Sequence, residues 1–131
     1  PDGKHIAFES NRLGQPVIFI MDSTGGAMQQ VTRLDSGNSY LPDWAPEGNA
    51  LIYSQGSSQP WLAMTKLVGI NIEEIRVNDD FRPVSDANFS PDGEFIVSES
   101  NGDIFVLRKN GTEIQNLTNN PANDFDPAWS P

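Results

Sequence analysis

The sequence predicts an all-β fold, a segment of a β-propeller with about three four-stranded antiparallel blades. One observation is a proline-centred motif whose prolines stand at positions 1, 46, 91 and 131, and so lie 45, 45 and 40 residues apart. A second is that a short apolar run rich in β-branched and aromatic residues follows each of the first three motifs. A third is that Gly, Pro, Asn and Asp separate these runs, as is typical of tight turns. Together they indicate a repeat of blade length.

The motif couples an aromatic residue to a turn. It reads Trp-Ala-Pro-Glu-Gly at residues 44–48, Phe-Ser-Pro-Asp-Gly at 89–93 and Trp-Ser-Pro at 129–131, and the chain opens on Pro-Asp-Gly. We therefore treat residues 1–131 as one propeller segment with repeats 1–45, 46–90 and 91–130. Since a propeller closes with about four to eight blades, we expect this segment to belong to a ring of about six to eight blades.

Composition excludes several classes of function. The net charge of −10, from 18 acidic and 8 basic residues, argues against nucleic acid as a partner, because phosphate contacts need clustered Lys and Arg. The absence of cysteine excludes disulfides and thiolate metal sites. No apolar run approaches the roughly 20 residues of a membrane-spanning helix.

Three strands are expected after each turn. The first contains residues 6–8, 51–53 or 95–97, the second 17–21, 61–65 or 104–107, and the third ends at 31–32 or 117–118. The middle repeat departs from this pattern, with Lys-Leu-Val-Gly-Ile at 66–70 where its siblings have a polar turn. Polar links at 35–38, 78–81 and 119–124 then lead to the next motif.

One aromatic residue occurs at the same phase in every repeat. These residues are Trp44, Phe89 and Trp129. We interpret them as side chains that pack between adjacent blades and are largely buried; the alternative is that they stack on a ligand.

The order of these motifs resembles the WD-like propeller repeat of the TolB family, across the whole chain and most clearly in the first and third repeats. The resemblance implies that the segment ending in Trp-Ser forms the innermost strand of a blade and that the next three strands complete it outward. Residues 6–32 would then lack an inner strand, and 126–130 would be an inner strand without outer partners. We expect further blades in a longer chain or a second copy of the segment, placed head to tail, to cover these edges.

Residues with catalytic or metal-binding chemistry are few. His5 is the single histidine, and neither a Gly-x-Ser-x-Gly elbow nor a phosphate-binding glycine loop occurs. The acidic stretch 119–126 offers oxygen atoms to a calcium ion but lacks the spacing of a calcium loop, so a turn is the simpler interpretation. We predict no catalytic residues, no cofactor and no metal site.

Three carboxylates are candidates for partner binding. Asp86 and Asp126 each stand three residues before the aromatic position, where the first repeat has Leu41, with Asp43 close by. If inner strands begin there, Asp43, Asp86 and Asp126 gather at one mouth of the propeller and attract a basic partner segment or a cation. The alternative is that they cap turns and keep the surface soluble.

The functional hypothesis is a non-enzymatic scaffold that binds protein partners, periplasmic or otherwise extracytoplasmic by the TolB resemblance alone. The main alternative is the non-catalytic propeller of a prolyl-oligopeptidase-type serine peptidase, because similar repeats occur there. A lectin-like propeller would need exposed aromatic residues in loops, for which Tyr40 and Trp61 are the candidates.

Overall fold

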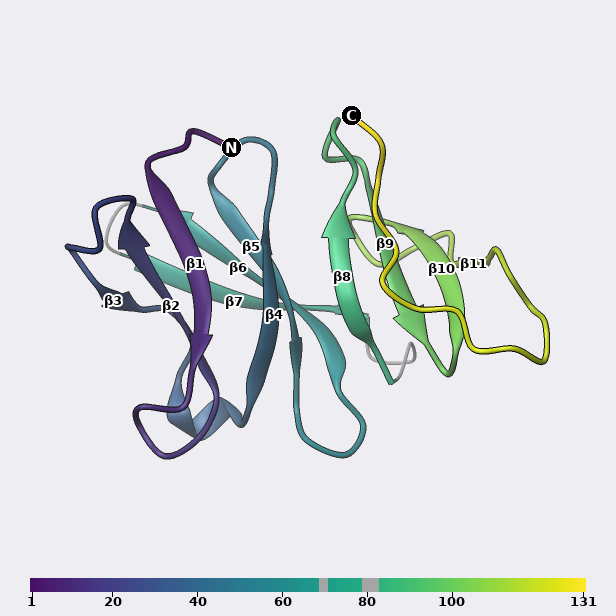
Figure 1. The fold of residues 1–131 in the computed structure, drawn as a ribbon, viewed down its shortest axis with the longest axis horizontal. Coiled ribbons are helices and arrows are strands. Elements are labelled where there is room, and N and C mark those ends of the chain that lie inside the picture. Colours follow the sequence, from purple (N-terminus) through teal and green to yellow (C-terminus); the bar gives the residue numbers. More distant parts are fainter. Residues whose placement is uncertain (69–70, 79–82) are drawn as a thin grey trace.

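The chain folds into three antiparallel sheets, which confirms the predicted all-β propeller architecture (Figure 1). The computed structural model describes residues 1–68, 71–78 and 83–131. The first sheet contains β1 (His5–Ser10), β2 (Val17–Asp22) and β3 (Gln29–Gln30). The second contains β4 (Ser39–Trp44), β5 (Ala50–Gln55), β6 (Trp61–Val68) and β7 (Asn71–Asn78), and the third contains β8 (Ser85–Phe89), β9 (Phe95–Ser100), β10 (Asp103–Arg108) and β11 (Gln115–Asn116). A short 3-10 helix, η1 (Leu34–Ser36), joins the first two sheets.

Each four-stranded sheet begins with the strand that contains the recurring aromatic residue. Sheet order is β4-β5-β6-β7 and β8-β9-β10-β11, so β4 and β8 are the first strands of their blades. Both follow a polar link and precede a Pro-x-Gly turn in sequence. In Figure 1 the three sheets stand side by side in chain order, with β1, β4 and β8 toward the viewer.

Two segments differ from the strands expected from sequence. β6 and β7 are long, and β6 continues through Lys66 and Leu67 beyond the expected end of the second strand at residue 65. The expected link at 78–81 begins at the last residue of β7, and residues 79–81, like 69–70, lie outside the described part of the chain. Residues 126–130 are not assigned to a strand; they pass beside β8 through the contacts of Asn88 described below, without forming a ladder.

Two apolar clusters join the three sheets, and β5 contributes to both. Ile52 belongs to the cluster shared with Phe89 of the third sheet. Leu51 and Tyr53, on the opposite face of β5, belong to the cluster shared with Ile18 of the first sheet. Alternation along a strand sends successive side chains to opposite faces, and β5 is buried throughout. Full burial of a large apolar side chain stabilises the fold by about 1.5–3 kcal/mol, so the middle sheet couples its neighbours.

The Pro-x-Gly turns of neighbouring repeats lie against each other. Gly48 N donates to Ala45 O at 2.8 Å, and Gly93 N donates to Ser90 O at the same distance. Gly93 has a φ of 68°, which glycine adopts at little cost. A methyl group on Gly93 would stand 3.0 Å from an oxygen of Glu47, in the preceding turn. The turns therefore form one continuous rim.

Candidate functional site

A shallow pocket of about 310 Å³ lies at the rim, where the inner segments of the three repeats end. Each repeat contributes residues from the same three positions to the lining, and Ser90 is the tenth lining residue. The position before the aromatic residue is Asp43, Asn88 or Ala128, the aromatic residue is Trp44, Phe89 or Trp129, and the proline of the turn is Pro46, Pro91 or Pro131. Equivalent repeat positions are related by the blade-to-blade rotation and so converge. We call the face formed by β4, β8 and residues 125–131 the axial face, because propeller blades surround a central channel.

The three aromatic residues each lie against the preceding sheet. Phe89 is 8% exposed and belongs to the cluster between the second and third sheets. Trp44 is half-buried, packs on the cluster between the first and second sheets, and its ring lies 6.4 Å from that of His5. Trp129 is also half-buried, and with Phe95 it lines an open hollow on the third sheet. Two of the three are thus more exposed than we expected.

Asp43 joins two inner strands. Its Oδ2 accepts a hydrogen bond of 2.9 Å from the backbone N–H of Phe89, so the carboxylate of β4 is bonded to β8. Burial raises the pKa of Asp43; the Phe89 and Trp44 amides oppose this, and the charge of Asp86 adds to it. Asp43 therefore holds neighbouring blades together in addition to carrying charge.

Asp86 and Asp126 occupy the same conformation as Leu41. Their φ values are 46°, 55° and 53°, all in the left-handed region. The register of β4 shifts between Tyr40 and Asp43, and that of β8 shifts between Ser85 and Asn88, so the inner strands share a bulge. Aspartate tolerates this conformation better than leucine, for which it costs about 1–2 kcal/mol. The aspartates thus have a conformational role as well as an electrostatic one.

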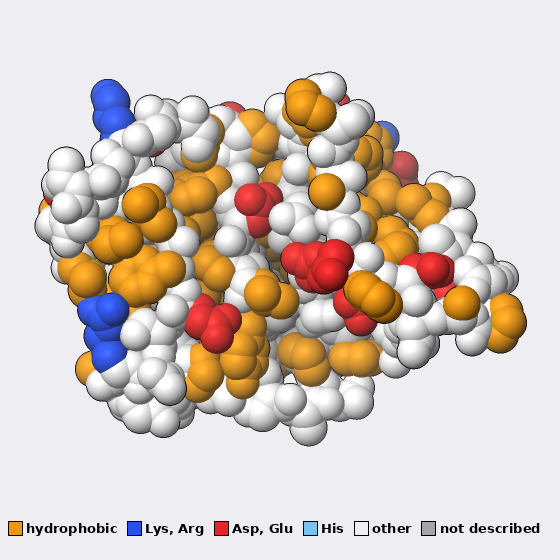
Figure 2. Space-filling model, in the orientation of Figure 1, with side chains coloured by type: hydrophobic (Ala, Val, Ile, Leu, Met, Phe, Trp, Pro, Cys, Tyr) orange, Lys and Arg blue, Asp and Glu red, His pale blue; other side chains and the backbone are white. Residues whose placement is uncertain are grey.

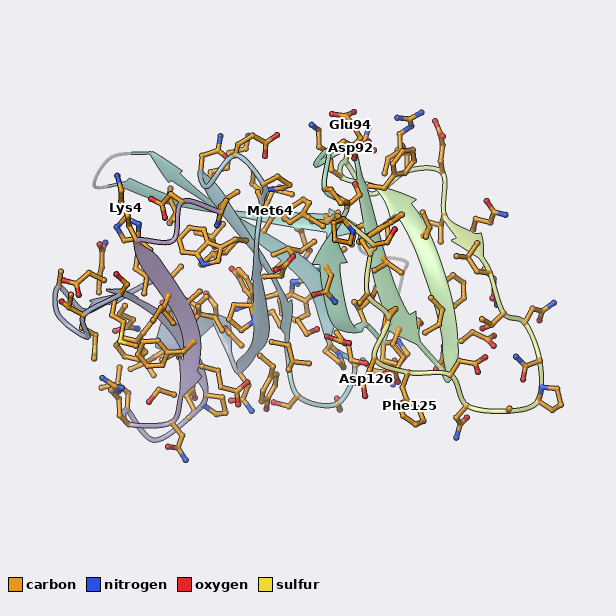
Figure 3. The ribbon with its side chains drawn as sticks, turned by 45° about the horizontal axis from the view of Figure 1, so that its top comes forward. Lys4, Met64, Asp92, Glu94, Phe125 and Asp126 are labelled. Atoms are coloured by element: carbon orange, nitrogen blue, oxygen red, sulfur yellow. The ribbon has the colours of Figure 1, made fainter. Side chains whose placement is uncertain are left out.

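The structure brings Asp43 and Asp86 close enough for their charges to interact, since Asp86 contributes to the raised pKa of Asp43. Asp86 is half-buried and Asp126 is exposed. Figure 3 shows Asp126 beside Phe125, at the opposite end of the third sheet from Asp92 and Glu94. Asp43 and Asp86 are therefore neighbours on β4 and β8, and Asp126 lies on the last segment at one end of the third sheet.

Equivalent contacts attach the start of each inner segment to the preceding sheet. Ser39 N donates to Pro16 O at 2.9 Å, Val84 N to Pro60 O at 2.9 Å, and Asp124 N to Gly102 O at 2.8 Å. Asn88 then connects β8 to the last segment: its Nδ2 donates to Pro127 O at 3.3 Å, and its carbonyl accepts from Trp129 Nε1 at 3.2 Å. The carboxylates thus stand on fixed backbone.

Sequence reasoning missed Glu9, a carboxylate on β1 that contacts the start of the first inner strand. Glu9 is exposed on β1, and its Oε2 accepts a hydrogen bond of 3.4 Å from Leu41 N. Its position in the strand after the turn differs from that of the inner-strand aspartates, so repeat alignment could not find it. Figure 2 shows acidic side chains across the middle of the face in view, with basic side chains toward its margins.

The other candidates have local partners. His5 Nδ1 lies 3.4 Å from Asp2 Oδ2. In the 119–126 stretch, Asn120 Nδ2 donates to Asp124 Oδ2 at 2.8 Å, and no set of three His, Cys, Asp or Glu side chains among the described residues could hold a metal ion. Tyr40 accepts a hydrogen bond from Asn38, and Arg76 stacks 4.2 Å from the centre of the Trp61 ring. Within the described ranges, no helix has the length and apolar character needed to cross a membrane.

Blades of antiparallel strands arranged around an axial face define the β-propeller class, and comparison with known proteins identifies the chain as TolB-like in fold. A solved TolB of Acinetobacter baumannii is 25% identical with a TM-score of 0.74, over 90% of this chain and 30% of that one. An Agrobacterium tumefaciens protein assigned to TolB is 23% identical with a TM-score of 0.81, over 92% and 44%. No family model matches.

Curated relatives include both TolB and a peptidase. A TolB homolog of Chlorobium luteolum is 30% identical over 98% of this chain and 30% of its own length. An uncharacterized peptidase of Bacillus subtilis, YuxL, is 26% identical over 100% of this chain and 19% of its own length. The chain thus spans less than a third of either relative.

Proposed function

We propose that this propeller is a non-enzymatic scaffold that binds a protein partner through its axial face. The observation that carries the proposal is the set of carboxylates on the inner segments: Asp43 and Asp86, which lie close together on β4 and β8, and Asp126 on the last segment. The similarity to TolB supports a scaffold and favours an extracytoplasmic location.

The partner segment that fits this face is basic. Clustered charge of one sign raises the rate at which an oppositely charged segment associates, and salt suppresses the effect. The net charge of −10 of the whole chain also favours association with a basic segment. The pocket at the rim, lined by proline and aromatic residues, would add apolar contact area.

The test is the association rate of a fluorescent lysine-rich peptide with the protein in stopped flow at low salt. We expect the double variant Asp86→Asn and Asp126→Asn to slow association about three- to tenfold, because the steering charge is lost while the backbone conformation is retained. The matched control, Asp35→Asn with Glu113→Gln, removes the same charge from exposed residues paired with Arg33 and Arg108. Equal effects in the two double variants would contradict a localised site.

A second candidate function rests on the peptidase relative, whose similarity covers the whole of this chain. Under this second candidate, the blades of this chain are part of the non-catalytic propeller of a prolyl-oligopeptidase-type enzyme. A solved prolyl endopeptidase shares the fold, at 18% identity and a TM-score of 0.58. Labelling the natural full-length gene product with a fluorophosphonate probe separates the two: a labelled serine outside residues 1–131 supports the peptidase, and no labelling supports the scaffold.

A further inference from the structure

A second recessed surface lies between the outer strands of the middle blade and the third blade. One cavity of about 340 Å³ is lined by β6, β7 and the turn after β10, and an adjoining one of about 240 Å³ extends to the rim. Met64, Lys66 and Lys109 line both, so the two cavities form one groove. Its described residues lie within the chain, away from both termini.

The floor of the groove is apolar. Met64 pairs with Ile75 across β6 and β7, so both side chains are on the same face, and Val77 follows at the same phase on β7. Met64 and Val77 pack against the core cluster that contains Phe89. Arg76, between Ile75 and Val77 in sequence, also lines the larger cavity; it pairs with Ala63 and stacks on Trp61.

Lysines line both walls of the groove, and Lys66 stands opposite Glu73 in the ladder between β6 and β7. Lys66 is exposed at the phase of Met64, and Lys109 faces it from the turn. Among the described residues that line the larger cavity there is no acidic side chain, whereas the chain as a whole carries 18. The smaller cavity includes Glu47 near the rim.

Lys109 already has one partner, which a ligand can replace. Its Nζ lies 2.8 Å from Glu94 Oε1, and about half of each side chain is exposed. This bond raises the pKa of Lys109, which keeps the ammonium charged. An exposed ion pair contributes little to stability, so a carboxylate of a ligand can displace Glu94 from Lys109.

We propose that this groove binds a partner segment in which an apolar side chain is flanked by carboxylates. The apolar side chain would contact Met64 and Ile75, and the carboxylates would pair with Lys66 and Lys109. Methionine suits such a site because its flexible thioether adapts to different shapes. The groove thus prefers a partner of the opposite charge to the one the axial face attracts.

The three methionines allow a direct test by NMR of protein labelled with ¹³C in the methionine methyl groups. The probe is a synthetic peptide with one leucine flanked by glutamates. We expect the Met64 methyl resonance to shift as the peptide is added, because Met64 lies where the two cavities meet. Met28, which is 45% exposed and lies just before β3 of the first sheet, should not shift. A glutamine-flanked peptide should bind more weakly, and a lysine-flanked one should produce no shift.

Charge reversal locates the site. Lys66→Glu should weaken glutamate-peptide binding about tenfold or more, because an attractive charge pair becomes a repulsive one. A tenfold loss of affinity corresponds to about 1.4 kcal/mol of binding free energy. Lys4→Glu, in the turn before β1 (Figure 3), changes the net charge equally and should have a small effect. An unmoved Met64 resonance at millimolar peptide, or equal losses in the two variants, would overturn the proposal. A Met64 shift that persists unchanged with the lysine-flanked peptide would also overturn it.

Discussion

Asp43 has a raised pKa, chiefly because burial penalises its charged form, while its carboxylate bonds to Phe89 N on the next inner strand. The folded pKa lies above the unfolded value of 3.8. The contribution of Asp43 to stability is therefore fully present below pH 3.8 and is lost as the pH rises through the folded pKa. Asparagine at this position keeps an oxygen for Phe89 but cannot ionise.

We predict that wild-type stability relative to Asp43→Asn falls as the pH rises from 3.8 through the folded pKa, and then stays constant. Urea unfolding across this range measures it. Asp35→Asn is the opposite control: its hydrogen bond to Arg33 lowers the pKa of Asp35, so its stabilisation is present above 3.8 and is lost as the pH falls through the folded pKa. If the stability difference from wild type changed with pH in the same direction for both variants, the raised pKa of Asp43 would be contradicted.

At the scale of the element, a threonine after the third strand closes the end of two blades. Thr32 Oγ1 accepts a hydrogen bond of 2.8 Å from Ile18 N, and Thr118 Oγ1 accepts one of 3.0 Å from Ile104 N. Thr32 is 1% exposed, whereas Thr118 is half-buried. The hydrogen bond from the backbone N–H to the threonine hydroxyl is therefore shielded from water in the first repeat and more accessible to water in the third.

We predict that Thr32→Val destabilises the fold by about 1–3 kcal/mol, because the buried Ile18 N–H loses its acceptor. Thr118→Val should cost less, since water can reach Ile104 more easily. Chemical denaturation of both variants gives the comparison. A Thr118 variant that loses more stability than the Thr32 variant would show that exposure does not set the cost.

Sequence reasoning was most successful for elements whose signals are local. The Pro-x-Gly turns and the apolar runs predicted the hairpins, because turn residues and period-two alternation act within a few residues. The expected second strand at 61–65 was too short in the middle repeat, where the polar turn of the other repeats is missing and β6 continues through Lys66 and Leu67 in its ladder with β7. We propose that 1–45, 46–90 and 91–130 are the repeat units, since the bulges and inner-segment contacts recur with them.

At the scale of the whole molecule, β5 is shared by both apolar clusters, so the sheets should unfold together. We predict that Phe89→Ala lowers stability by about 3–5 kcal/mol and leaves a single unfolding transition. Trp129→Ala should cost less because Trp129 is half-buried. Calorimetry tests both statements. Two separated transitions in the Phe89 variant would show that the sheets are independent, and equal losses would argue against packing between blades as the main role of Phe89.

The sequence by itself determined the class of fold, the positions of the inner strands β4 and β8 and the acidic character of the chain, because each of these follows from local pattern or composition. Tertiary structure alone decided which charges act together. It placed Glu9 beside Leu41, tied Asp43 to Phe89, and set Lys66 and Lys109 around Met64 in an otherwise acidic protein. These contacts join residues from different blades, and their geometry depends on the rotation between blades, which no periodicity along the chain encodes.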